Sequence, residues 1–260
     1  MSSDFDTAAQ QYDTYFSFSE IGKAQRERVY HFLQEQLLSK GQKLHILELN
    51  CGTGEDAHYL TQQGHTVLAT DISEGMIAQA RQKFGDRINF SVQDINTITA
   101  DTFSQQFDLI FSNFGGLNCL SPEQIQNFLS KAQNLLQPEG MLSLVIMPKA
   151  CLWERVYFLA KAQFKKAFRR NAKQAVLANV DGVDVATWYY DPQQLKNWTH
   201  THFKTITLAP IGIAIPPSYL EPFFKTKKGL LKFLKRAETY LTSSTLARYA
   251  DHYMILLQKQ

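Results

Sequence analysis

The sequence predicts an α/β fold in which a mostly parallel sheet carries helices on both faces. Three observations lead to this prediction. Short apolar runs alternate with amphipathic stretches as far as about residue 148. Capping residues and glycines separate the two kinds of segment, and five of the apolar runs have the length of a strand. Such strand–helix alternation is typical of parallel sheets that are covered by helices.

The helices of the first half are expected from local signals. Residues 20–39 have an amphipathic pattern, which Gly41 would end. The positions on or near its apolar face are Ile21, Val29, Phe32 and Leu37. A helix of about ten residues follows the first strand, and Ser73 can cap another over residues 73–84. A further helix starts with Ser121-Pro-Glu and stops at Pro-Glu-Gly140.

The five strands of this half fall between those helices. They are expected at residues 43–49, 64–71, 88–94, 107–114 and 141–148. After residue 148 the alternation changes, with a long helix, a strand pair, a short helix, a strand, a helical insertion and a last strand. Their expected ranges are about 152–170, 176–190, 191–201, 203–215, 216–247 and 250–259.

These elements predict one domain over residues 1–260. We expect an N-terminal cap (1–40), a ligand-binding core (41–150) and two lid insertions (151–190 and 216–247). The composition, 44% apolar and 20% charged, is that of a globular protein. The polar, acidic N-terminus is not a signal peptide, and the three cysteines lack CxxC spacing. We therefore expect a cytoplasmic protein with free thiols and no metal site.

Positive charge is concentrated in two stretches of the chain. Residues 151–175 hold seven Lys/Arg and one Glu, and residues 225–236 hold six Lys/Arg and no acid. The rest of the chain is therefore acidic, although the whole carries only +3. Both basic stretches fall in the expected lid insertions, so an anionic partner is one hypothesis and a solvated charged face is the other.

The stretch LELNCGTGEDA, residues 48–58, has the glycines of a ligand-binding loop between a strand and a helix. A phosphate-binding loop would need Gly-Lys-Ser/Thr, whereas Gly54 is followed by Glu55 and Asp56. Two acids at a helix N-terminus would repel a phosphate. A dinucleotide fingerprint would need a third glycine. The loop therefore favours a ligand that is not anionic at this point, with a plain turn as the alternative.

Acidic residues end three successive strands. Glu48 can meet an amino group, Asp71 can accept both ribose hydroxyls, and Asp94 can take an adenine amino group. In parallel sheets the ligand binds beyond the carboxyl ends of the strands. These three positions together predict a pocket for S-adenosylmethionine. Surface charges at Glu48 and Asp71, or a helix cap at Asp94, are the alternatives.

The sequence resembles the class I S-adenosylmethionine-dependent methyltransferases over roughly residues 40–150. The matching segments, in order, are ILELNCGTG, ATDISEGMIAQAR, VQDI and FDLIFSNFGGLNCL. The resemblance implies a Rossmann-like sheet of seven strands. It also implies an enzyme that takes a methyl group from S-adenosylmethionine. Asn50 replaces the first glycine of the usual loop, a mild departure because Asn tolerates positive φ.

The resemblance also identifies further cofactor residues. It puts Ile72 beside adenine, and Ser112, Asn113 and Phe114 at the strand end where the sulfur and methyl group would lie. Core packing and simple strand termination are the alternatives for these positions. The full set of expected cofactor residues is Tyr12, Glu48, Asn50, Gly52, Gly54, Asp71, Ile72, Met76, Asp94, Ile95, Ser112, Asn113 and Phe114.

The remaining segments are similar to a bacterial branch of small-molecule methyltransferases. In that branch Tyr12 would close over the cofactor, and the two insertions would form a substrate lid. The expected substrate residues are Asn118, Trp153, Tyr157 and Tyr189. Candidates for a general base are Trp153, Glu154, Tyr189, Tyr190 and His252, and no spacing selects one of them. His200, at a helix end, is expected to be solvated.

Two classes of function compete. The first is methylation of a small or carrier-tethered hydrophobic metabolite, anionic or neutral, which an apolar lid face with a cationic rim would suit. The second is an RNA methyltransferase that uses the basic stretches on phosphates. Against the second, the fourth strand ends in SNFG rather than Pro-Pro-aromatic, and no nucleic-acid-binding module is recognisable. Peripheral membrane contact through the basic lid, and a cofactor-binding protein without catalysis, are minor alternatives.

Overall fold

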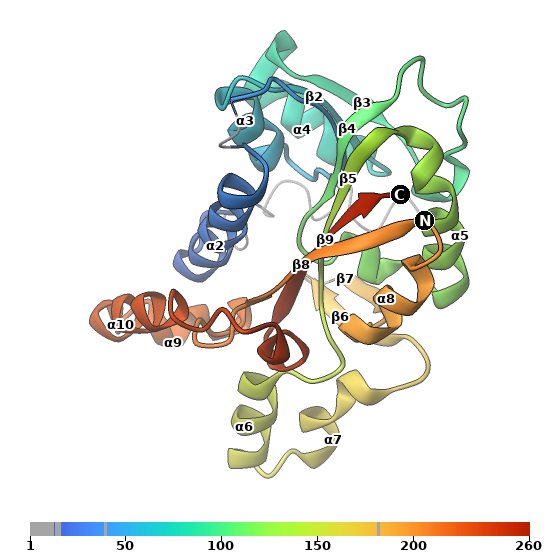
Figure 1. Cartoon of the computed structure of the whole chain (residues 1–260). Coiled ribbons are helices and arrows are strands. Elements are labelled where there is room, and N and C mark those ends of the chain that lie inside the picture. Colours follow the sequence, from blue (N-terminus) through green and yellow to red (C-terminus); the bar gives the residue numbers. More distant parts are fainter. Residues whose placement is uncertain (1–12, 14–16, 39–40, 181–182) are drawn as a thin grey trace.

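A computed structural model describes residues 13, 17–38, 41–180 and 183–260. It confirms the predicted α/β fold, with a seven-stranded sheet in the order β3-β2-β1-β4-β5-β9-β8 (Figure 1). The strands of this sheet are β1 His45–Leu49, β2 Thr66–Asp71, β3 Asn89–Val92, β4 Phe107–Ser112, β5 Leu136–Ile146, β8 Phe203–Ile211 and β9 His252–Lys259. A separate hairpin pairs β6 Val176–Val180 with β7 Val183–Thr187.

The strand directions bring one set of ends to a common edge. Strands β3, β2, β1, β4 and β5 run parallel, whereas β9 is antiparallel to both of its neighbours, β5 and β8. Leu49 of β1 lies opposite Ser112 of β4, and Ile146 of β5 lies opposite Tyr253 of β9. The carboxyl ends of the parallel strands therefore share an edge with the amino end of β9. Below we call it the carboxyl edge.

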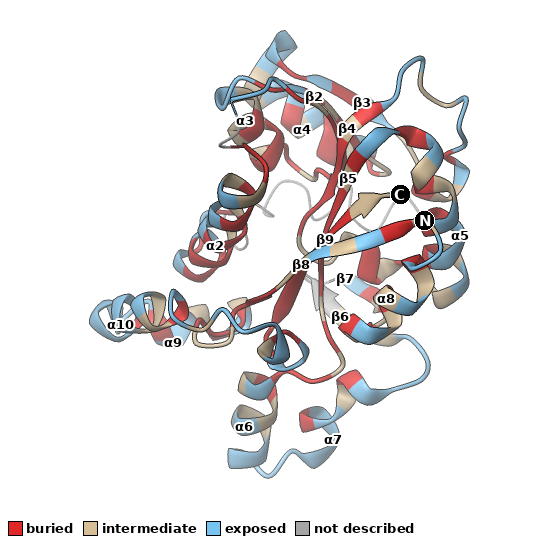
Figure 2. Cartoon of the chain, in the orientation of Figure 1, coloured by how far each residue is buried: buried red, intermediate tan, exposed pale blue. Residues whose placement is uncertain are grey.

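Helices cover both faces of the sheet (Figure 1). On one face, side chains of α2, α3 and α4 pack into a core with the strands. On the other face, α5 and α8 supply the apolar residues. The central strands are accordingly buried, as Figure 2 shows. The bounds are α2 Glu20–Gln36, α3 Glu55–Gln62, α4 Glu74–Phe84, α5 Pro122–Leu135 and α8 Pro192–Thr199.

Local signals explain where these helices start. Ser73 accepts a hydrogen bond from the Met76 N–H and caps α4, as predicted. Ser121 and Gln124 form a reciprocal capping box at the start of α5. The predicted apolar face of α2 is buried, with Ile21 and Val29 inaccessible to solvent. Caps of this kind give hydrogen-bond partners to the backbone N–H groups in the first turn of a helix, which have none within the helix.

The long helix expected over residues 152–170 is wrong. The structure has α6 Leu152–Ala160, a break, and the single turn α7 Phe164–Ala167. Ala162 adopts a left-handed φ of 55°, and the Gln163 N–H bonds back to the Phe158 carbonyl, which closes α6. The apolar face predicted along that helix is also broken, because Val156, Phe164 and Phe168 are exposed. The strand β5 starts at Leu136, earlier than predicted, because Pro138 cannot continue α5.

The lid region extends from the sheet as separate helices (Figure 1). The second insertion contains α9 Glu221–Phe224 and α10 Lys228–Glu238. A small apolar cluster joins α9 and α10 to the start of α2, through residues such as Ile21, Phe224 and Leu231. Among the described residues, no helix is both long and apolar enough to cross a membrane.

Candidate functional site

The glycine loop after β1 passes through three left-handed residues. Asn50, Gly52 and Gly54 have φ values of 53°, 53° and 85°, so the expectation that Asn50 tolerates positive φ is confirmed. Gly54 precedes α3, and a Cβ there would lie 2.8 Å from the Phe90 ring. The loop is therefore shaped by conformations and a close contact that favour glycine.

Asp71 holds this loop in place. One carboxylate oxygen, Oδ2, accepts the Gly52 N–H at 2.9 Å, and Oδ1 accepts the Ser73 N–H at 2.9 Å. Asp71 ends β2 and therefore ties the loop after β1 to the loop after β2. Ile72 is half-buried next to it, and Met76 is buried in the first turn of α4. The structure thus brings these predicted residues together at the carboxyl edge.

Asp94 follows β3 and caps a short 3-10 helix, which is the alternative role that the sequence left open for it. Its Oδ1 atom accepts the Asn96 backbone N–H at 2.8 Å and the Asn96 side-chain amide at 3.0 Å. Ile95 is buried in the core cluster that α5 covers. A cap does not exclude a ligand, because a carboxylate has about four acceptor sites.

Glu48 places a carboxylate in the interior at the end of β1. It is 1% exposed, and its Oε2 atom has no hydrogen-bond partner within the part of the chain that the structure describes. Burial, followed by the negative charge of Asp56, raises the pKa of Glu48 well above its ordinary value, although Arg26 opposes the rise. An ammonium or hydroxyl group of a ligand would satisfy such an acceptor.

The end of β4 presents a second buried group of this kind. The Asn113 Nδ2 atom is buried and has no partner among the described residues, while Oδ1 accepts the Phe114 N–H. Ser112 is inaccessible and accepts from the Asn50 amide at 3.3 Å. Phe114 adopts a left-handed φ of 36°. Within the described residues, a donor after β4 and an acceptor on the adjacent strand β1 are therefore both unpaired, which fits a polar cofactor at this edge.

Other predicted residues have different positions. Asn118 is inaccessible and uses its amide on backbone, donating to the Trp188 and Met147 carbonyls and accepting the Met147 N–H. Its contacts are those of a scaffold residue. Tyr190 likewise donates its hydroxyl to the Leu120 carbonyl. Tyr12 lies outside the described residues.

The lid residues face different partners. Trp153 donates its indole N–H to the Ala214 carbonyl at 3.1 Å, which joins α6 to the segment that follows β8. The Tyr157 hydroxyl accepts from Lys161 at 2.6 Å. Tyr189 is buried with the Arg170 guanidinium 5.1 Å from its ring centre. His200 is exposed, as expected.

A buried ionic network, which no local pattern in the sequence predicts, joins the first insertion to α2 and to the start of β9. Arg170 donates to Glu154 through Nε, and to Asp251 through a 2.7 Å contact at Oδ1 and a 2.9 Å contact at the carbonyl. Gln25 of α2 donates to Asp251 Oδ2 at 3.1 Å. Burial alone would raise the pKa of Asp251, but His252 and Arg170 outweigh it and hold that pKa below its ordinary value. The sequence signal that could have indicated the network is Asp251, an acid directly before the last apolar strand.

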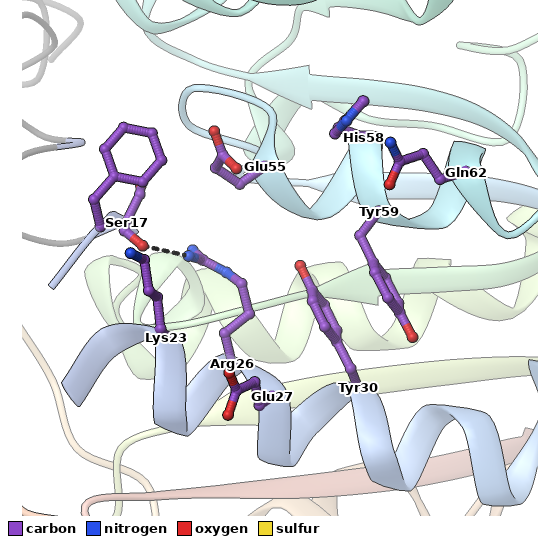
Figure 3. Close-up of a pocket in the computed structure, with 10 residues that line it drawn as sticks. Ser17, Lys23, Arg26, Glu27, Tyr30, Glu55, His58, Tyr59 and Gln62 are labelled. Atoms are coloured by element: carbon purple, nitrogen blue, oxygen red, sulfur yellow. Dashed lines mark hydrogen bonds between the residues drawn. The ribbon is translucent and has the colours of Figure 1, made fainter. Parts of the chain in front are cut away.

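A cavity of about 240 Å³ lies between α2 and α3 (Figure 3). Arg26 projects beside it, donating Nε to Asp56 at 3.0 Å and a terminal nitrogen to the Ser17 carbonyl at 3.5 Å. Glu55, which directly follows Gly54, is the part of its lining nearest in sequence to the glycine loop. The other lining residues are Phe18, Lys23, Glu27, Tyr30, His58, Tyr59 and Gln62.

Comparison with known proteins agrees with this site. Residues 46–140 match a family described as a methyltransferase domain. The chain is 36% identical over 115 residues to YqeM of Bacillus subtilis, a match that covers 43% of this chain and 44% of YqeM. It is 34% identical over 149 residues to the malonyl-[acyl-carrier protein] O-methyltransferase of Bacillus cytotoxicus, covering 53% and 46%. The chain thus spans less than half the length of both curated relatives.

The fold agrees with solved structures as well. Magnesium protoporphyrin IX methyltransferase from Synechocystis PCC 6803, with bound S-adenosylhomocysteine, superposes with a TM-score of 0.60 at 15% identity. The superposition covers 98% of this chain and 94% of that one, and at 15% identity it shows a shared fold and nothing about the substrate. The sheet order and the glycine loop agree with the matched domain, and together they support a methyltransferase domain of the class I S-adenosylmethionine-dependent kind over residues 46–140.

Proposed function

We propose that the protein transfers a methyl group from S-adenosylmethionine to a hydrophobic metabolite, small or carrier-tethered, that carries an anionic group. The observation that carries this proposal is the pairing of two features at one edge. Glu48 Oε2 and Asn113 Nδ2 lie at adjacent strand ends, buried and without a hydrogen-bond partner in the described segments of the chain. The two insertions, with exposed apolar and basic residues, leave the same edge of the sheet after β5 and β8.

In this proposal the chain holds the cofactor through the three strand ends. Glu48 accepts from the amino group of the methionine part, and Asp71, which ties the glycine loop to the end of β2, accepts from the ribose hydroxyls. Asp94, Ile72 and Ile95 surround adenine, Ser112 to Phe114 lie beside the sulfonium, and the glycine loop lets the ligand approach the backbone. Tyr12 is proposed as the cap that closes the site.

S-adenosylmethionine supplies a methyl group on a positively charged sulfur that leaves as a neutral thioether. The chain's work is therefore alignment of the acceptor and exclusion of water. Trp153 supports this, because its ring packs edge-on against Phe224 of α9, with the ring centres 6.1 Å apart, and so joins the first insertion to the second. Burial of Ser112 and Asn113 keeps the end of β4 dry.

The lid supports a hydrophobic substrate with an anionic group. Large apolar side chains remain exposed there, on both insertions, and lysines lie between them. The exposed apolar residues are Leu152, Val156, Leu159, Phe164, Phe168, Phe223, Leu230 and Phe233. One relative is named for a malonyl-carrier substrate, which combines a carboxylate with a carrier tether. A cationic rim would raise the local concentration of such an acid.

An RNA substrate has less support. Arg170, counted among the cations of the first insertion, is 5% exposed and pairs with Glu154 and Asp251. Arg169 also pairs with Glu154, and Lys235 pairs with Glu27 at 2.9 Å. These contacts reduce the free positive charge that could meet phosphates.

The rim can be tested by reversing four exposed lysines, Lys225, Lys227, Lys228 and Lys232, to Glu. Labelled methyl transfer to malonyl-pantetheine and to a neutral ester analogue would be measured at 20 and 200 mM salt. We expect KM for the acid to rise several-fold at low salt, with a smaller rise at high salt because salt screens surface charge. Binding of S-adenosylhomocysteine should not change. An unchanged KM at low salt would rule out the rim.

A further inference from the structure

We propose that His252, oriented by Asp251, is the proton acceptor of the methyl-transfer reaction, so that the acceptor group is a hydroxyl or an acidic carbon rather than a carboxylate. This inference rests on the proposed function and adds the class of the acceptor. It starts from a histidine that sits at the carboxyl edge and is oriented by the network that sequence analysis did not anticipate.

Two contacts orient the His252 ring. Its Nδ1 atom lies 3.3 Å from Asp251 Oδ2, within ion-pair distance but outside hydrogen-bond alignment. The ring also meets Phe114 edge-on, with the ring centres 5.2 Å apart. Nδ1 is shut off from solvent, whereas Nε2 is not, and Nε2 has no hydrogen-bond partner in the described part of the chain. One nitrogen therefore faces the carboxylate and the other is available.

Groups from two parts of the chain stabilise the Asp251 carboxylate as an anion, and a third contact fixes its backbone. Arg170 from the first insertion contacts its Oδ1 at 2.7 Å, and Gln25 from α2 contacts its Oδ2 at 3.1 Å. The backbone N–H of Asp251 donates to the Gly212 carbonyl at 3.0 Å, at the end of β8. Such a carboxylate beside Nδ1 selects the tautomer with its proton on Nδ1 and stabilises the ring when Nε2 gains a proton.

The position of His252 suits a reaction at the end of β4. It is the first residue of β9, which runs antiparallel, and so it lies at the carboxyl edge with Ser112 and Asn113. Its contact with Phe114 joins it to the segment proposed to lie beside the sulfonium. Neither ring nitrogen makes a hydrogen bond within the described residues, and Nε2, unlike Nδ1, is not shut off from solvent, so it can meet a ligand.

The chemistry balances without a further reactant. As the acceptor oxygen or carbon forms its bond to the methyl carbon, the carbon–sulfur bond breaks and its electron pair stays on sulfur. The proton of the acceptor passes to Nε2 of His252 and then to solvent. A carboxylate has no proton to lose at neutral pH, so it would need no such residue.

The substitution His252→Asn removes the proposed base and keeps the polar contact that His252 makes with Asp251. The Asn amide can replace Nδ1 beside Asp251, but it has nothing at the position of Nε2. Three probes test the acceptor class: malonyl-pantetheine, 4-hydroxybenzoyl-pantetheine and acetoacetyl-pantetheine. His200→Ala, at an exposed histidine on α8, is the matched control. Binding of S-adenosylhomocysteine is measured on every variant.

We expect methylation of the phenol or acidic-carbon probe, a 10²–10⁴-fold lower kcat in His252→Asn, and no change in His200→Ala. Added imidazole should partly restore His252→Ala. Transfer to the carboxylate oxygen of the malonyl probe alone, with none to its methylene carbon or to the other probes, or a His252→Asn rate within twofold of the parent, would overturn this inference and leave the proposed function intact. Failure of the parent chain to bind S-adenosylhomocysteine would instead overturn the proposed function.

A spectroscopic readout needs no turnover. Long-range ¹H–¹⁵N spectra of the histidine side chains, assigned with His252→Asn, report which nitrogen carries the proton. At pH 8 we expect Nδ1 to be protonated and Nε2 bare, and we expect Asp251→Asn to shift the ring toward the other tautomer. A proton on Nε2 in the parent chain would contradict the proposed role.

Discussion

The contact between Gly54 and Phe90 gives the sharpest test of how the glycine loop is built. Gly54 and Gly64 have nearly the same left-handed conformation, with φ of 85° and 91°. A Cβ at Gly54 would lie 2.8 Å from the Phe90 ring and 3.2 Å from Ala80, whereas a Cβ at Gly64 would meet nothing within 4 Å. The substitutions Gly54→Ala and Gly64→Ala therefore share a backbone penalty and differ in the contact.

The difference between the two variants can be estimated. A left-handed conformation costs an L-residue about 1–2 kcal/mol, and both variants bear that cost. Overpacking a buried site adds about 1–3 kcal/mol, which falls on Gly54→Ala alone. For a chain of this size, 1 kcal/mol shifts Tm by roughly 2–4 °C. Gly54→Ala should therefore melt about 2–12 °C below Gly64→Ala.

The assay is urea unfolding of the full chain at 25 °C, with thermal melts in parallel. Gly54→Ala should also bind S-adenosylhomocysteine more weakly, because a shift of Phe90 or of the loop moves the backbone that meets the ligand, while Gly64→Ala should bind normally. Equal stability of the two variants would refute the steric reasoning. It would mean that the loop relaxes around the new methyl group at no cost.

Two further predictions concern buried carboxylates. The pKa of Glu48 is raised in the folded chain, so above the ordinary value of 4.5 the folded chain still holds a proton that the unfolded chain has lost. The free energy of unfolding therefore falls as pH rises through that range. The fall is at most about 1.4 kcal/mol per pH unit. Glu48→Gln should therefore melt higher than the parent at pH 8 and bind S-adenosylhomocysteine more weakly; a lower melt would contradict the assignment of an unpaired carboxylate. Glu154→Ala leaves Arg170 without one of its two acids and should cost about 3–5 kcal/mol of unfolding free energy. The exposed Glu123→Ala should cost under about 0.5 kcal/mol in the same urea titrations, and equal losses would argue against the network.

The parallel half of the sheet could be predicted because its signals are local. Apolar runs set β1, β2 and β4, and Ser73 and Ser121 set the helix starts. The strand-end acids were found for the same reason, since topology brings consecutive strand ends to one edge. The break in the lid at Ala162 had no such signal, because an alanine in a left-handed conformation leaves no mark in the sequence.

The ionic network could not be predicted because it depends on tertiary contacts. Arg170 and Asp251 are 81 residues apart and meet only when the lid folds against the start of β9. Asn118 was expected near the substrate, but its amide bonds to backbone at Met147 and Trp188, partners that sequence spacing does not reveal. Local patterns therefore identified the edge of the sheet, whereas long-range pairing decided what each polar group does there.

The central claim is that the polar strand ends bind S-adenosylmethionine. Calorimetry of S-adenosylhomocysteine binding to the full, folded chain tests it, with Asp71→Ala and the exposed Asp86→Ala as a pair. Loss of hydrogen bonds to a charged group costs about 1.5–3 kcal/mol, so Asp71→Ala should bind about 10- to 150-fold more weakly, while Asp86→Ala matches the parent. No binding by the parent chain, or equal affinity in Asp71→Ala, would contradict the account.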